Sequence, residues 1–137
     1  MNAERKRLVQ TSWEAIVPDH DRAAARFYER LFENDAGARA LFANTNMVEQ
    51  RVKFVNMVGE IIRNLDLPEE LIPTLSALGR RHVDYGVRPI HYDRVREALF
   101  AALAMELGDG FTTDVRDAWE EAYALLASVM LRGAETR

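Results

Sequence analysis

The sequence predicts an all-α protein with six to eight helices, and three observations carry this prediction. The 137 residues suit one domain, residues 1–137, which is large enough to bury a core. Apolar residues recur at helical spacing along most of the chain, as at Leu99, Leu103 and Leu107. No stretch shows the alternating pattern of a half-buried strand, and no hairpin dipeptide separates β-branched runs.

The first half of the chain predicts three longer helices and one short apolar step. A helix that stops near Pro18 has its apolar positions at Leu8, Val9, Trp13 and Ile16. A second helix begins after Asp19 or Asp21 and carries Phe27, Tyr28, Leu31 and Phe32. The step Leu41-Phe42 precedes the turn-like residues 43–46. The helix expected over about 47–65 has two apolar rows, which indicates a wide buried face against a neighbouring helix or a flat group.

The second half predicts helices that are separated by proline and glycine. Pro68 with two glutamates is a favourable helix start, and Pro73 is expected to interrupt this segment and restart it. After Gly86 and Pro89 comes a helix with one apolar stripe, formed by Tyr92, Val95, Leu99, Leu103 and Leu107. The stretch GDGFTTD ends it, and Thr112 or Thr113 is expected to cap the last helix.

Composition excludes several classes of function. The formal net charge is −4, so the chain has no basic footprint for nucleic acid or an anionic membrane surface. No apolar run is long enough to span a membrane, and the N-terminus lacks an apolar signal core, so we expect a cytoplasmic protein. The absence of cysteine excludes disulfides, thiol nucleophiles and cysteine-ligated metal centres.

One of the three histidines stands out because it lies on an apolar helix stripe. His82 continues the spacing of Leu71, Leu75 and Leu78, so its imidazole is expected to point inward. If Nδ1–H bonds to the Leu78 carbonyl one turn back, Nε2 is left as a bare acceptor that can bind a metal. The alternative is an ordinary core histidine that finds a second hydrogen bond.

The other two histidines are expected to be ordinary: His20 is solvated in a connection, and His91 is exposed or caps a helix start. The spacing of His82 and His91 matches no zinc motif. A single buried histidine without carboxylate or cysteine partners suits haem better than a bare metal ion.

Five segments in order give the chain a resemblance to a known family. They are FYERLF at 27–32, Leu41-Phe42, Gln50 with Phe54 one turn later, GRRHVDYGVRPIHY at 79–92 and DAWEEAYALLASVM at 117–130. The chain resembles the globins over about residues 5–132, most closely the bacterial single-domain haemoglobins and the haem domain of flavohaemoglobins. The resemblance implies the globin fold and a non-covalent haem b, iron protoporphyrin IX.

The resemblance also implies roles for single residues. His82 matches the proximal iron ligand, Phe42 the aromatic that packs on haem, and Tyr92 the tyrosine near the proximal histidine. Tyr28 and Gln50 match the distal pair that donates hydrogen bonds to dioxygen, and Phe54 matches the apolar distal residue. Lys53, Arg80 and Arg81 are candidates for the haem propionates, with a solvated surface role as the alternative. Outside the family pattern, the two phenylalanines would be core residues, Tyr28 a buried aromatic and Gln50 part of a solvated face.

Two departures from the family pattern bear on function. Ala134 stands where members with peroxidase-like proximal chemistry have a glutamate, and the nearest carboxylate is Glu135. The chain ends at Arg137, so we expect no flavin and nicotinamide reductase domain.

The implied function is reversible binding of dioxygen, and of NO and CO, for storage or scavenging, in a monomer or homodimer without catalytic residues. The alternatives are nitric oxide dioxygenation with a separate reductase, haem-based gas sensing, and a haem-free interaction module.

Overall fold

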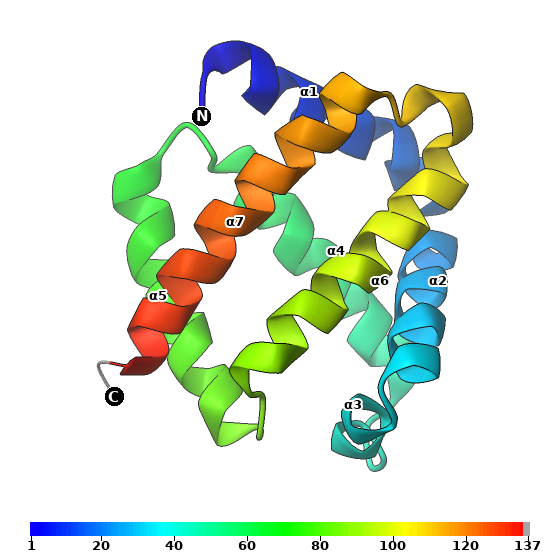
Figure 1. The fold of residues 1–137 in the computed structure, drawn as a ribbon, viewed down its shortest axis with the longest axis vertical. Helices are drawn as coiled ribbons and strands as arrows, with labels where there is room; N and C mark the ends of the chain where they lie inside the picture. The colour runs from blue at the N-terminus through cyan, green and yellow to red at the C-terminus, as the bar shows by residue number, and fades with distance from the viewer. Residues whose placement is uncertain (136–137) are drawn as a thin grey trace.

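The computed structural model describes residues 1–135, and this part of the chain folds into seven α-helices without a strand (Figure 1). The helices are α1 (Ala3–Ile16), α2 (His20–Asn34), α3 (Ala36–Leu41), α4 (Met47–Arg63), α5 (Pro68–Asp84), α6 (Pro89–Leu107) and α7 (Thr113–Glu135). The 3₁₀ turns Val17–Asp19 and Gly108–Gly110 follow α1 and α6. The all-α prediction is therefore confirmed, while residues 136 and 137 of the predicted domain lie outside the described part. None of the described helices is long and apolar enough to cross a membrane.

Short polar side chains fix where several helices begin. The side chain of Asn46 accepts hydrogen bonds from the backbone N–H groups of Val48 and Glu49, and so caps α4. The Thr112 hydroxyl accepts from the Val115 N–H at 3.2 Å, which confirms the expected cap of α7. Such caps satisfy N–H groups that have no partner within the helix, and each contributes roughly 1 kcal/mol to helix stability.

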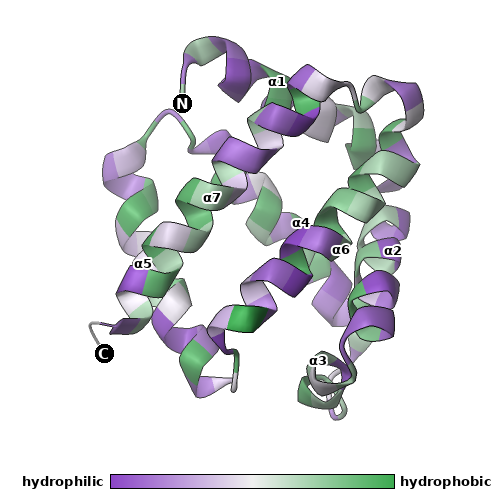
Figure 2. Ribbon diagram, viewed as in Figure 1, coloured by the Kyte–Doolittle hydropathy of each residue, from purple (hydrophilic) through white to green (hydrophobic). Residues whose placement is uncertain are grey.

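The helices pack mainly in pairs, with α1 and α5 against α7, α2 against α6, and α4 against α1 and α2 (Figure 1). Hydrophilic and hydrophobic residues are mixed along most of the helices, as expected for helices that pack around a shared core (Figure 2). The main core includes Trp13 and Trp119, whose ring centroids lie 6.4 Å apart. A second, smaller cluster of Leu75, Leu78 and Met130 joins α5 to α7. Two members of this cluster, Leu75 and Leu78, lie on the same helix as His82.

Two glycines allow α5 and α7 to approach closely. A Cβ atom added to Gly79 would lie 2.0 Å from the Met130 carbonyl oxygen, and one added to Gly133 would lie 2.3 Å from that of Ser76. Neither distance leaves room for a methyl group, so the close packing of these backbones depends on glycine at both positions. The position of α5 relative to the core therefore depends on this contact.

The expectation that Pro73 interrupts its helix is wrong, because α5 runs continuously from Pro68 to Asp84 with Pro73 inside it. Proline removes one backbone hydrogen bond, here the bond that residue 73 would donate to the carbonyl of Glu69. Pro73 is exposed, so water can bind the carbonyl that is left free. The apolar stripe of Leu71, Leu75 and Leu78 spans the proline and stabilises the helix on both sides of it.

Candidate functional site

Helix α5 holds His82 with one ring nitrogen fixed and the other free. Nδ1 lies 2.8 Å from the carbonyl oxygen of Leu78, which confirms the hydrogen bond expected from the sequence. Nε2 has no hydrogen-bond partner among residues 1–135. The side chain is half-buried at the end of the stripe formed by Leu75 and Leu78. Burial lowers the pKa of the His82 imidazole, the Leu78 bond raises it and the charge of Arg81 lowers it, with a net lowering. A neutral imidazole with a free Nε2 is a competent metal ligand.

Tyr28 on α2 and Gln50 on α4 form a hydrogen-bonded pair across two helices. The Gln50 side-chain amide donates to the Tyr28 hydroxyl oxygen over 3.0 Å. Because that oxygen is the acceptor, the Tyr28 hydroxyl hydrogen remains available to donate to another group. Burial raises the pKa of Tyr28 by more than the Gln50 bond lowers it, so the phenol keeps its proton at neutral pH. The pair therefore offers one O–H donor and the second amide hydrogen of Gln50.

Aromatic rings surround Tyr28 and fix its orientation. Phe42 meets it edge-on with 5.5 Å between ring centroids, and Phe54 does so at 5.6 Å. Phe54 stacks on Phe27 with a centroid separation of 4.3 Å and an interplanar angle of 10°. In the sequence Phe27 is only one apolar position of its helix, because a phenylalanine at helical spacing gives no sign of what it packs against. The rings of Phe27, Phe42 and Phe54 leave the Tyr28 hydroxyl little freedom to turn away from Gln50.

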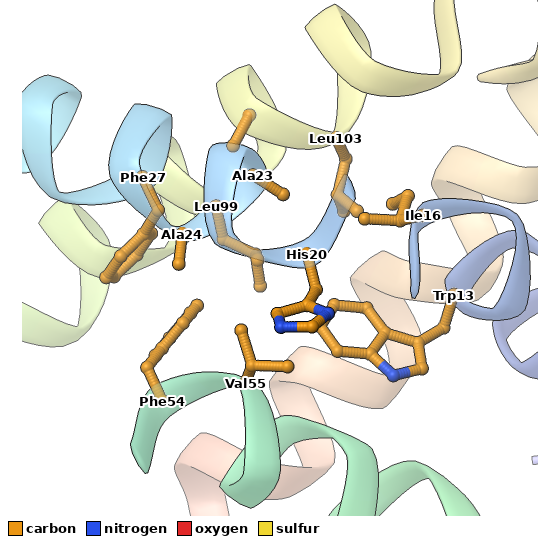
Figure 3. Close-up of a pocket in the computed structure, with 11 residues that line it drawn as sticks. Trp13, Ile16, His20, Ala23, Ala24, Phe27, Phe54, Val55, Leu99 and Leu103 are labelled. Carbon is orange, nitrogen blue, oxygen red and sulfur yellow. The ribbon is translucent and has the colours of Figure 1, made fainter. Parts of the chain in front are cut away.

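Behind the Phe27–Phe54 stack lies a small apolar pocket where α1, α2, α4 and α6 meet (Figure 3). Its cavity volume is about 10 Å³, room for a water-sized molecule only. His20 lies at this pocket beside Trp13 (Figure 3), and its Nδ1 is 2.8 Å from the Val17 carbonyl oxygen. His20 is exposed, as the sequence predicts, but it is the first residue of α2 and not part of a connection. The pocket is too small for a cofactor, so a large ligand must bind elsewhere.

The N-terminal half of α4 and the C-terminal half of α5 carry Gln50 and His82 and leave several apolar side chains exposed. The other ends of these helices are in contact, because Met57 and Ile61 of α4 pack against the Leu75–Leu78 cluster. Just beyond the C-terminal end of α5, a Cβ atom added to Gly86 would lie 3.2 Å from the side chain of Leu41, the last residue of α3. Apolar side chains on these stretches nevertheless stay exposed, namely Val48, Val52 and Val83. These exposed apolar side chains share the two stretches with His82 and Gln50.

The remaining candidates from the sequence are more peripheral. Lys53 and Arg81 are exposed, Arg80 is half-buried, and none of the three forms an ion pair with another described residue. Tyr92 is half-buried, burial raises its pKa, and its backbone carbonyl accepts a hydrogen bond of 2.6 Å from the Tyr123 hydroxyl. Sequence reasoning missed this role of Tyr123, because the contact joins residues that are 31 positions apart.

Two further expectations concern metals and the proximal side. His91 caps α6, because its Nδ1 accepts a 2.8 Å hydrogen bond from the Arg88 N–H. Within residues 1–135 no group of three or more histidine, cysteine, aspartate or glutamate side chains could hold a metal ion. At the end of α7, Ala134 is half-buried and Glu135 is exposed. A lone histidine such as His82 suits a metal that arrives with most of its ligands already in place.

Comparison with known proteins gives one family match and several similar relatives. The Globin family model matches residues 25–130. The flavohemoprotein of Bacillus subtilis (strain 168) is 33% identical over 126 residues, 90% of this chain and 32% of that protein. The chain thus spans about a third of the length of the flavohemoproteins it matches. A globin-like protein of Aquifex aeolicus (strain VF5) is 32% identical over 131 residues, 96% of this chain and 92% of that protein.

Two solved structures share the fold over nearly the full length of the chain. One is an engineered carbene transferase made from a candidate nitric oxide dioxygenase of Rhodothermus marinus, with a TM-score of 0.87 and 26% identity. The match covers 99% of this chain and 94% of that one. The other is a hexacoordinated heme protein from an anhydrobiotic tardigrade, with a TM-score of 0.86 over 98% of this chain and 96% of that one. At 17% identity the second likeness concerns the fold alone.

Proposed function

Because the chain belongs to the globin family, we propose that it holds haem b non-covalently on His82 and reversibly binds dioxygen, NO and CO. The observation that carries this proposal is the state of His82, whose Nδ1 is fixed by Leu78 while Nε2 is free. A porphyrin supplies four ligands to its iron, so one protein nitrogen is sufficient to anchor it. Haem, when bound, supplies the iron centre at which a diatomic gas coordinates.

The residues of the α4–α5 region fit such a group. Val48, Val52 and Val83 offer exposed apolar side chains that a porphyrin face would cover. Covering them would contribute about 25 cal/mol for each Å² of apolar surface removed from water. Lys53 and Arg81 are exposed cations without an ion-pair partner among the described residues, which suits them to carboxylate groups at the edge of the ring.

Tyr28 and Gln50 determine how tightly a diatomic ligand is held. Dioxygen bound at such an iron would carry partial negative charge and would accept hydrogen bonds much as an anion does. The Tyr28 O–H and the second amide hydrogen of Gln50 are free to donate. A charge-assisted hydrogen bond contributes roughly 1.5–3 kcal/mol, or about a ten- to hundredfold slower dissociation. Slow release favours storage or scavenging over bulk delivery.

Nitric oxide dioxygenation with electrons from a separate reductase is the second candidate function. It is favoured by 33% identity to a flavohemoprotein and by likeness to an enzyme derived from a candidate nitric oxide dioxygenase. The two functions share Tyr28 and Gln50, because a retained dioxygen is what nitric oxide would meet. Consumption of nitric oxide by the reduced protein under air, over many turnovers with an added reductant, would distinguish dioxygenation from simple binding.

The oxygen dissociation rate tests the proposed role of the distal pair. Tyr28→Phe removes the hydroxyl with little change of shape, and Gln50→Leu removes the amide. Each should release dioxygen about ten times faster or more, whereas carbon monoxide, a poorer acceptor, should respond much less. Gln10→Leu is a matched control, because its side-chain amide donates to the Ile62 carbonyl at the other end of α4. Dioxygen release within twofold of wild type in both distal variants would contradict the assignment.

A further inference from the structure

Tyr85 combines exposure to solvent with closeness to His82. It follows the last residue of α5, has 63% of its surface exposed, and its ring centroid lies 6.0 Å from that of His82. Its hydroxyl has no hydrogen-bond partner among the described residues. The other tyrosines differ: Tyr28 is buried, while Tyr92 and Tyr123 are partly buried.

Backbone hydrogen bonds fix the main chain from which the His82 and Tyr85 side chains extend. The Tyr85 N–H lies 3.1 Å from the Arg81 carbonyl oxygen and 3.2 Å from that of His82. Just beyond, the Val87 N–H donates to the same His82 carbonyl over 2.9 Å. Gly86 makes this turn at a φ of +89°, which is open to glycine at little cost. Tyr85 is therefore held beside His82 by the same hydrogen bonds that end α5.

Phenols and indoles are the protein side chains most readily oxidised by one electron. Both tryptophans lie in the main core, with Trp13 8% and Trp119 4% exposed. A buried phenol or indole also lacks water to take up the proton that oxidation releases. Tyr85 has that water, and its ring is adjacent to the imidazole proposed to hold the iron. An oxidising equivalent that arises beside His82 thus has a short route to solvent through Tyr85.

We propose that Tyr85 is a one-electron oxidation site through which oxidising equivalents from hydrogen peroxide leave the protein. This inference rests on the proposed function, because peroxide would react at the haem that His82 holds. Each Tyr85 phenol gives up one electron and one proton and becomes a phenoxyl radical. One hydrogen peroxide takes up two electrons and two protons and becomes two waters. Two phenoxyl radicals on separate chains then couple, forming a carbon–carbon bond between the rings and a dityrosine.

The test treats haem-loaded protein with hydrogen peroxide and follows dityrosine fluorescence and covalent dimers on denaturing gels. Wild type should form dimers whose cross-linked peptides contain residue 85, and Tyr85→Phe should lower the yield at least tenfold. Tyr123→Phe, which removes a partly buried phenol, should still cross-link. Haem-free protein treated in the same way should not. A nitroso spin trap, with the adduct located by mass spectrometry, detects the radical on single chains even where two chains rarely meet.

The outcomes separate this inference from the proposed function. The haem absorption band of each sample is recorded before peroxide is added. If the haem band is normal and Tyr85→Phe cross-links as much as wild type, the role of Tyr85 is overturned and haem binding stands. The same holds if the spin-trap adducts are found on other residues only. A wild-type protein that takes up no haem contradicts the proposed function, and the inference fails with it.

Discussion

Replacing Gly79 with alanine tests whether the close approach of α5 and α7 is required for stability. Helix propensity alone predicts that Gly79→Ala stabilises α5 by about 0.5–1 kcal/mol. The structure predicts the opposite, because the new methyl group would lie 2.0 Å from the Met130 carbonyl oxygen. That neighbour is backbone, so the helices themselves must separate to make room. Overpacking of this kind costs about 1–3 kcal/mol. Because the opposing atoms are backbone, we expect the upper part of this range, which leaves a net loss of about 1–2.5 kcal/mol after the propensity gain.

The assay is urea and thermal unfolding of the haem-free protein. A loss of that size should lower the melting temperature by about 3–5 °C for each kcal/mol. Gly59→Ala in α4 is the matched control, since its nearest neighbours would be the Arg63 side chain at 3.4 Å and the Trp13 side chain at 3.5 Å. This variant should be as stable as wild type or slightly more so. A Gly79→Ala protein at least as stable as wild type would refute the packing argument.

Two further predictions concern the core and pH. The buried Trp119 indole N–H donates to the Ser12 hydroxyl over 2.9 Å, and Ser12→Ala removes this acceptor. The free energy of unfolding, measured by urea titration, should fall by about 1–3 kcal/mol. Thr11→Ala, on the exposed side of α1, should lower it by less than half as much. Burial lowers the pKa of His82 below its ordinary 6.5, so in acid the unfolded chain takes up a proton that the folded chain resists. The free energy of unfolding of the haem-free protein should therefore fall as the pH drops from about 6.5 towards the lowered pKa of His82. A His82→Gln variant whose free energy of unfolding depends on pH in the same way as that of wild type would contradict this.

Much of the fold followed from the sequence because the helices are amphipathic. Apolar spacing placed the helices, and the stripe from Leu71 to Leu78 pointed to His82 and to its bond with the Leu78 carbonyl, which the structure confirms. Pro73 was misjudged because local rules count the hydrogen bond that proline removes but not the packing on either side of it.

Contacts between side chains that are far apart in the chain could not be predicted from the sequence. Nothing in the order of residues shows that Gln50 donates to Tyr28 or that Phe27 stacks on Phe54. The same holds for Gly79, whose importance depends on a carbonyl of α7. The position of Tyr85 beside His82 follows from their spacing on one helix, but its oxidation becomes a question only once His82 is assigned to the iron.

The haem content of a His82→Ala variant tests the central claim most directly. The claim is that the free Nε2 of His82 supplies the protein ligand to haem iron. Wild type reconstituted with haem should show one haem per chain, and His82→Ala should lose most of it, with partial recovery on addition of imidazole. His91→Ala, which alters a helix cap instead, should keep its haem. Full retention of haem by His82→Ala, with an unchanged absorption spectrum, would contradict the assignment.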